Sequence, residues 1–120
     1  MNGTDSNWSE ERVHHPPLRI AVGIATSGRP LILARLLERL RVQARIADAV
    51  IVCSSSPADV SGIDSGHPGL RCITSDRGLT IQRNAILRAG AAFDLVVFLD
   101  DDFVPCPGYL QAVERTFMTR

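Results

Sequence analysis

The chain has 120 residues, of which 45% are hydrophobic, and its 13 basic residues balance 13 acidic ones. This length suits one modest domain. The balanced charge excludes a general electrostatic attraction to nucleic acid or to an anionic membrane. All 13 basic residues are arginine. The absence of lysine excludes a Schiff-base mechanism and a P-loop lysine.

Residues 1–17 are polar and show no periodicity. We predict a flexible N-terminal tail, followed by a single domain over residues 18–120. The chain has neither the apolar core of a signal peptide nor a run of about 20 apolar residues that could span a membrane. The chain has three widely spaced cysteines, Cys53, Cys72 and Cys106. This spacing indicates that they act as small hydrophobic side chains in a reducing compartment, and not as disulfides or zinc ligands. A cytoplasmic protein is therefore expected.

A strand is predicted over Arg19–Ala25, followed by a turn and then a helix that starts at Pro30. Leucines recur at helical spacing in this helix, at Leu33, Leu36, Leu37 and Leu40. The apolar run Ala49–Cys53 predicts a second, buried strand. A long loop is expected over residues 54–69, which are rich in Ser, Asp, Gly and Pro.

A short third strand near an edge of the sheet is predicted over Leu70–Thr74. A second helix should have Thr80 as its N-cap and Gly90 as its C-cap. The run Leu95–Leu99 predicts a buried strand of a parallel sheet. A last helix is expected from Pro107, with one face formed by Leu110, Val113 and Phe117. The order β-α-β-β-α-β-α predicts an α/β fold, Rossmann-like, with a mostly parallel sheet and helices on both faces.

The most informative segment is the acidic triple Asp100, Asp101 and Asp102, which directly follows the strand predicted over Leu95–Leu99. Three adjacent carboxylates repel one another unless water or a cation lies among them. Ligands of open α/β sheets bind at the carboxyl ends of the strands. Hard oxygen ligands favour Mg²⁺ or Mn²⁺, with phosphate oxygens completing the coordination.

Two other turns are expected at the same edge of the sheet. Gly78 relaxes the backbone where a helix begins, and helix N-termini attract anions. Arg77 precedes this turn, and Arg83, about one helical turn later, could reach a diphosphate or pair with an aspartate of the triple. The turn Thr26–Pro30, with its small and hydroxyl side chains, would let a base or ribose approach the backbone.

Together these three segments resemble the nucleotide-binding half of family 2 glycosyltransferases, which have the GT-A fold. The family's turn after the first strand is matched loosely by Ala25–Arg29, and its Gly-x-x-x-x-Arg-Asn helix start is matched well by Gly78–Asn84. Its Asp-x-Asp signature is matched closely by Phe98–Asp102. The resemblance covers residues 18–120 with the motifs in the family's order.

The resemblance implies a metal-assisted, inverting transfer of a sugar from a nucleoside-diphosphate donor to an acceptor hydroxyl. It places the nucleoside beside the Thr26 turn and beside Arg77 or Gly78. It places Asp100 and Asp101 toward the ribose and sugar. Asp102, with Asp100, would hold Mn²⁺ or Mg²⁺. The residues expected to bind substrate are Thr26, Ser27, Arg29, Ser54, Arg77, Gly78, Arg83, Asp100 and Asp101.

The sequence departs from the family pattern at two points. Cys53 and Ser54 stand where the family commonly has an acidic pair that reads the base, so the donor could carry guanosine, thymidine or uridine. The family's general base lies well downstream of the Asp-x-Asp strand, and this chain ends about one helix after that strand. A metal-bound Asp102 would be a poor base, so no catalytic base is assigned in the sequence. The chain is then either a fragment of a longer enzyme or a product that cannot complete catalysis by itself.

Two alternatives stay open. One is a GT-A-like nucleotidyltransferase, although the turn Thr26–Pro30 has only one glycine and one arginine where such enzymes carry a glycine-rich basic loop. The other is a non-catalytic nucleotide-binding fragment. The donor sugar, the acceptor (glycan, lipid or small molecule) and the oligomeric state do not follow from the sequence, and no nucleic-acid partner is expected.

Overall fold

A computed structural model describes residues 18–63 and 66–119 of the chain, so the tail predicted over residues 1–17 lies outside the described residues. The elements follow one another in the predicted order. They are β1 (Ile20–Ala25), α2 (Pro30–Arg41), β2 (Ala49–Ser54), the short 3₁₀ helix η1 (Pro57–Val60), β3 (Leu70–Thr74), α3 (Leu79–Ala89), β4 (Leu95–Asp100) and α4 (Tyr109–Met118).

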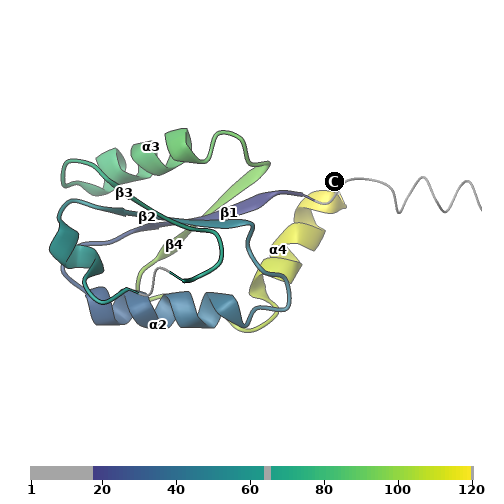
Figure 1. The fold of residues 1–120 in the computed structure, drawn as a ribbon. Helices are drawn as coiled ribbons and strands as arrows, with labels where there is room; N and C mark the ends of the chain where they lie inside the picture. Colours follow the sequence, from purple (N-terminus) through teal and green to yellow (C-terminus); the bar gives the residue numbers. More distant parts are fainter. Residues whose placement is uncertain (1–17, 64–65, 120) are drawn as a thin grey trace, which may run out of the picture.

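The four strands form one parallel sheet in the order β3-β2-β1-β4 (Figure 1). At the end of β1, Ala25 is in register with Cys53 of β2 on one side and with Asp100 of β4 on the other. Cys53 is in turn in register with Ile73 of β3. The carboxyl ends of all four strands therefore lie at the same edge of the sheet, and the predicted α/β fold is confirmed.

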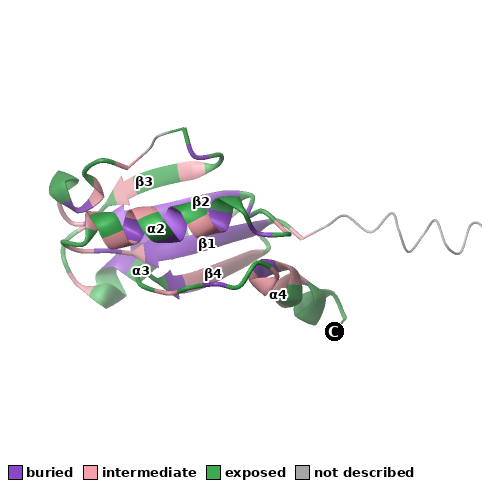
Figure 2. Cartoon of the chain, turned by 90° about the horizontal axis from the view of Figure 1, so that it is seen from below, coloured by how far each residue is buried: buried purple, intermediate pink, exposed green. Residues whose placement is uncertain are grey.

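Helices cover both faces of the sheet, with α2 and α3 on opposite sides (Figure 1). The predicted leucine face of α2 is confirmed, because Leu33, Leu36, Leu37 and Leu40 are all buried. Figure 2 shows buried stretches alternating with exposed ones along α2. α4 reaches the same core through Leu110. On the opposite face, Ile86 of α3 lies so close to β1 that a Cβ on Gly23 would stand 2.6 Å from its Cγ2 atom. Glycine at this position thus permits the close packing of α3 on the sheet.

The prediction that the Leu95–Leu99 strand is buried is wrong for most of its length. β4 pairs only with β1 within the described sheet, so Leu95 to Phe98 are half-buried and Leu99 alone is buried. Phe117, placed on the buried face of the last helix, is 51% exposed, because α4 packs through its first turn. Cys72 and Cys106 are exposed rather than packed as small hydrophobic residues, whereas Cys53 is buried.

Local backbone geometry corrects two further predictions. α3 begins at Leu79 with Gly78 as its N-cap, not with Thr80, which lies inside the helix. Gly78 has φ +141°, a conformation that other residues rarely adopt, so the glycine sets the start of the helix. The long loop after β2 contains η1, where Ser56 and Asp59 form a reciprocal capping box.

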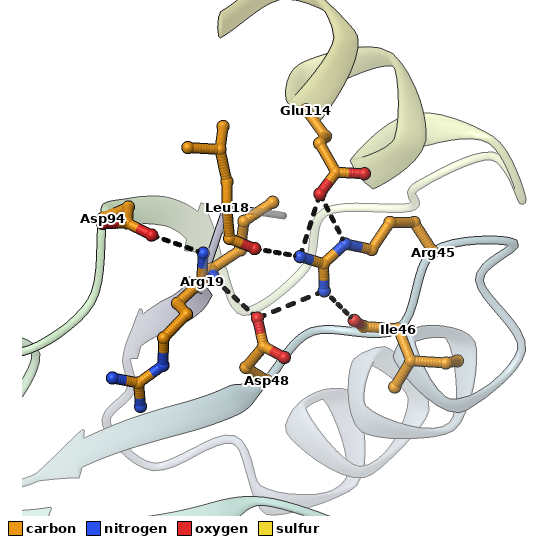
Figure 3. Close-up of polar contacts among 8 residues, drawn as sticks. Leu18, Arg19, Arg45, Ile46, Asp48, Asp94 and Glu114 are labelled. Carbon is orange, nitrogen blue, oxygen red and sulfur yellow. Dashed lines mark hydrogen bonds and ion pairs between the residues drawn. The ribbon is translucent and has the colours of Figure 1, made fainter. Parts of the chain in front are cut away.

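A polar cluster joins the elements at the amino edge of the sheet (Figure 3). The Arg45 guanidinium donates to Asp48 at 3.2 Å and forms an ion pair with Glu114 of α4 at 3.0 Å. It also donates to the carbonyls of Leu18 and Ile46. Burial acts to lower the pKa of Arg45, but the hydrogen bond to Glu114 and the two carboxylate charges raise it overall. Arg45 therefore stays charged and fastens α4 to the sheet.

Candidate functional site

The loops that leave β1, β2 and β3 are hydrogen-bonded to one another at the carboxyl edge of the sheet. The Thr26 amide donates to the Cys53 carbonyl at 3.0 Å, and the Ser75 amide donates to the Ser54 carbonyl at 3.0 Å. The sequence motifs that were expected to meet at this edge do lie on adjacent loops.

Gln82, in the first turns of α3, connects the loop after β1, the end of β2 and the loop after β3. Its Nε2 donates to the carbonyls of Thr26 at 3.1 Å and Cys53 at 2.9 Å, and its Oε1 accepts from the Gly78 amide at 3.3 Å. The side chain is 4% exposed. Sequence reasoning missed this residue. The available signal was a polar side chain at an inward-facing position of the helix, three residues before Ala85 and four before Ile86.

Asp101 is the buried member of the acidic triple, at 3% exposed. One carboxylate oxygen accepts from Thr26 Oγ1 at 3.0 Å and from Arg29 Nε at 3.2 Å, and the other forms an ion pair with Arg29 Nη2. The resemblance had placed Asp101 toward a ribose or sugar. In the structure its carboxylate instead points inward, onto the turn after β1, which it fixes against the end of β4.

Asp100 and Asp102 lie on either side of Asp101 and are exposed. The Asp102 side chain is 61% exposed, and its closest cation is Arg29 Nη1 at 3.9 Å. Along β4, Val96 and Phe98 pack on the α3 side of the sheet, and Val97 and Leu99 on the α2 side. Since side chains alternate along a strand, Asp100 continues the α3 side. The two carboxylates that a ligand can reach are therefore Asp100 and Asp102.

Asp59 is a second buried carboxylate that the sequence did not single out. Its Oδ1 accepts from the Gly28 amide at 2.7 Å, and its Oδ2 accepts from the amides of Ser55 and Ser56, each at 3.1 Å. The bond from Gly28 is the largest cause of a lowered pKa, which the bonds from Ser55 and Ser56 reinforce and burial opposes. Asp59 thus joins the β1 loop to the β2 loop. Its oxygens are engaged within the protein, and the sequence signal was the Ser-x-x-Asp spacing of a capping box.

The other predicted site residues differ in exposure and in their contacts. Arg77 is exposed and donates to Ser27 Oγ at 3.3 Å, which brings the Gly78 turn beside the Thr26 turn. Ser54 is 1% exposed and is buried under the edge. Arg83 has its guanidinium carbon 5.6 Å from the centre of the Phe98 ring. Over residues 18–63 and 66–119 no ion pair links Arg83 to the acidic triple, and Arg83 is an exposed residue.

The donor set at this edge consists of hard carboxylate oxygens. Within the described ranges, no three His, Cys, Asp or Glu side chains gather closely enough to hold a metal ion by themselves. Mg²⁺ is commonly bound by one or two carboxylates while water and substrate phosphates complete its octahedron. The exposed carboxylates of Asp100 and Asp102 are ligands of that kind and number, and water and a phosphate would have to complete such a site.

No model of a known protein family matches the chain, and a search of curated proteins finds no significant match. In the part of the chain that the structure covers, no helix combines the length and the apolar character needed to cross a bilayer.

Proposed function

We propose that this chain is the donor-binding part of a glycosyltransferase that moves a sugar from a nucleoside diphosphate to an acceptor hydroxyl by a metal-assisted, inverting reaction. The resemblance to family 2 glycosyltransferases supports this proposal through three motifs. The parallel sheet supports it as well, because it brings those motifs to one edge.

The observation that carries the proposal is that the three aspartates of the acidic triple differ in burial and in bonding. Asp101 is buried and is bound by Thr26 and Arg29, whereas Asp100 and Asp102 are exposed at the end of β4. A capping or packing role for the triple does not require that Asp100 and Asp102 stay exposed on either side of the buried Asp101. A divalent ion that carries a diphosphate uses such a pair directly.

The side chains at the edge would act by binding and orientation. Asp100 and Asp102 would hold Mn²⁺ or Mg²⁺, which neutralises the charge that develops on the departing nucleoside diphosphate. Ser27 and Arg77 would contact the nucleoside, and Arg83 would supply positive charge on the α3 side. As the acceptor oxygen forms its bond to the anomeric carbon, the bond from that carbon to the diphosphate oxygen breaks. The acceptor's proton goes to a base that this chain does not identify.

Calorimetric titration with uridine, guanosine and thymidine diphosphates, with and without Mn²⁺, tests the proposal. We expect one of the three to bind with a dependence on Mn²⁺. In Asp102→Asn we expect binding to weaken at least about tenfold and the metal dependence to disappear, because a charge-assisted ligand is lost.

Asp94→Asn is the matched control, since Asp94 lies just before the same strand at its opposite end and accepts from the Arg19 amide at 2.7 Å. An asparagine there keeps an accepting oxygen, so nucleotide binding should be unchanged. The proposal fails if no diphosphate binds at millimolar concentration, or if Asp94→Asn and Asp102→Asn weaken binding equally.

A further inference from the structure

A concavity lies on the α2 side of the acidic triple. It has a volume of about 240 Å³ and opens between α2 and the loop that follows β4. We call it the α2 groove. Its lining residues are Ile32, Arg35, Arg39, Asp101, Asp102 and Val104.

Two arginines one helical turn apart form the α2 wall of this groove. Arg35 is exposed and Arg39 is half-exposed. In the described part of the chain, neither guanidinium forms an ion pair with a carboxylate. By contrast, Asp101 on the inner wall is already paired with Arg29. Asp102 also lines the groove, and its ion pair is with Arg29 at 3.9 Å. The groove thus offers two adjacent guanidinium groups that form no ion pair with a described carboxylate.

We propose that the α2 groove binds a phosphomonoester on the acceptor substrate, an inference that rests on the proposed function. Two guanidinium groups at i and i+4 can each donate a pair of hydrogen bonds to a doubly charged phosphate. Ile32 and Val104 give the groove apolar walls beside the arginines, so an organic phosphate should bind better than inorganic phosphate.

The geometry favours the acceptor over the donor as the ligand of the α2 groove. Asp100 and Arg83 lie on the α3 side of the sheet, where Arg77 also borders the Thr26 turn. The Arg29–Asp101 pair borders the groove, since Asp101 is one of its lining residues. A donor bound on the α3 side would therefore leave the α2 groove to a second anionic ligand, which we infer to be the acceptor.

The test is a titration of the full chain with phenyl phosphate. Binding is measured by calorimetry and by changes in the NMR signals of the arginine side chains. We expect binding that shifts the Arg35 and Arg39 signals and that weakens about tenfold for each arginine in Arg35→Gln and Arg39→Gln. Saturating Mn²⁺ and nucleoside diphosphate should leave phenyl phosphate bound. A parallel arm uses phosphatidylcholine vesicles with and without phosphatidic acid. Binding only to the phosphatidic acid vesicles, again lost in the double variant, would identify the phosphate as a lipid headgroup.

Arg88→Gln serves as the control, because Arg88 is an exposed arginine in the last turn of α3 on the opposite face of the sheet. The inference is overturned if neither probe binds, if the double variant binds as well as Arg88→Gln does, or if the nucleoside diphosphate displaces phenyl phosphate. A different result separates the two proposals. If no diphosphate binds but phenyl phosphate still requires Arg35 and Arg39, the donor site is refuted and the phosphate site stands.

Discussion

The two edges of the sheet both carry arginines and carboxylates, but the edges differ in how many of these charged groups are paired. At the amino edge, Arg45 has its guanidinium engaged by two carboxylates and two carbonyls and is 16% exposed (Figure 3). At the carboxyl edge, Arg29 and Asp101 form a comparable pair. There, however, Asp100 and Asp102 remain exposed beside it.

This difference separates charges that hold the fold from charges that can serve a ligand. A partly buried ion pair with all its hydrogen bonds satisfied has no capacity for another partner. Exposed carboxylates close together in the sequence at a rigid edge repel one another, and a cation relieves that repulsion. The comparison predicts that substitutions at the amino edge change stability alone, whereas substitutions at the carboxyl edge also change binding.

The largest expected effect is at Arg45. Arg45→Ala removes the ion pair with Glu114, which is 17% exposed, and leaves that carboxylate and Asp48 without their cation. We expect a loss of about 3 kcal/mol in the free energy of unfolding, measured by urea denaturation. Binding of Mn²⁺ and nucleoside diphosphate by the folded fraction should be unchanged, since Arg45 lies at the opposite edge.

Arg88→Ala is the control for this measurement and should change stability by less than about 0.5 kcal/mol. If Arg45→Ala is as stable as this control, the amino-edge cluster does not hold α4. If it weakens nucleotide binding in the folded protein, the two edges are not independent.

The sequence predicted elements that depend on neighbouring residues, and it missed contacts between residues that are far apart in the chain. The leucines of α2 repeat at helical spacing, so its buried face followed directly from the sequence. The acidic triple was recognisable from the sequence. The burial of Asp101 between two exposed aspartates was not, because its partner Arg29 is 72 residues away in the sequence. Gln82 was overlooked for the same reason, since its partners lie on two other loops.

The error at β4 has another physical origin. An apolar run such as Leu95–Leu99 indicates contact with covering helices, and it does not specify how many neighbouring strands are present. β4 pairs with β1 alone in the described sheet and stays half-buried. The start of α3 was misplaced because Thr80 is a common capping residue, whereas the unusual φ of Gly78 cannot be read from residue type.

Two buried glutamines sharpen the comparison between the edges. Gln43 donates to the Cys106 carbonyl at 2.7 Å and accepts from the Leu110 amide at 3.1 Å, which ties α4 to the α2–β2 connection. Gln82 makes equivalent contacts with the loops of the candidate site. Gln82→Leu and Gln43→Leu should each cost about 2 kcal/mol of stability, because each leaves buried backbone groups unpaired.

Only Gln82→Leu should also weaken Mn²⁺-dependent nucleotide binding, by about tenfold in calorimetry, because only this glutamine positions the Thr26 and Gly78 turns. Gln43→Leu is the matched variant. Equal binding by the two proteins would mean that the loops of the carboxyl edge keep their arrangement without Gln82.

The smallest expected effect is at Asp59 and depends on pH. Asp59→Asn replaces one accepting oxygen with an NH₂ group, which then faces amides that also donate. Because the folded pKa of Asp59 is lowered, its stabilising contribution is complete above the ordinary aspartate pKa of about 3.9 and is lost as the pH falls through the folded value. The substitution should therefore cost about 1.5 kcal/mol at neutral pH.

Below the folded pKa the native protein and Asp59→Asn should have similar stability, since the native carboxyl is then also protonated. Urea denaturation from neutral pH down to the acid limit of folding measures this convergence. Asp76→Asn, at an exposed aspartate just after β3, should follow the native curve throughout. A constant difference between the native protein and Asp59→Asn at every pH would show that the ionised state of Asp59 does not cause the stabilisation. The β1 and β2 loops would then be joined by hydrogen bonds that the protonated carboxyl of Asp59 also accepts, and not by its negative charge.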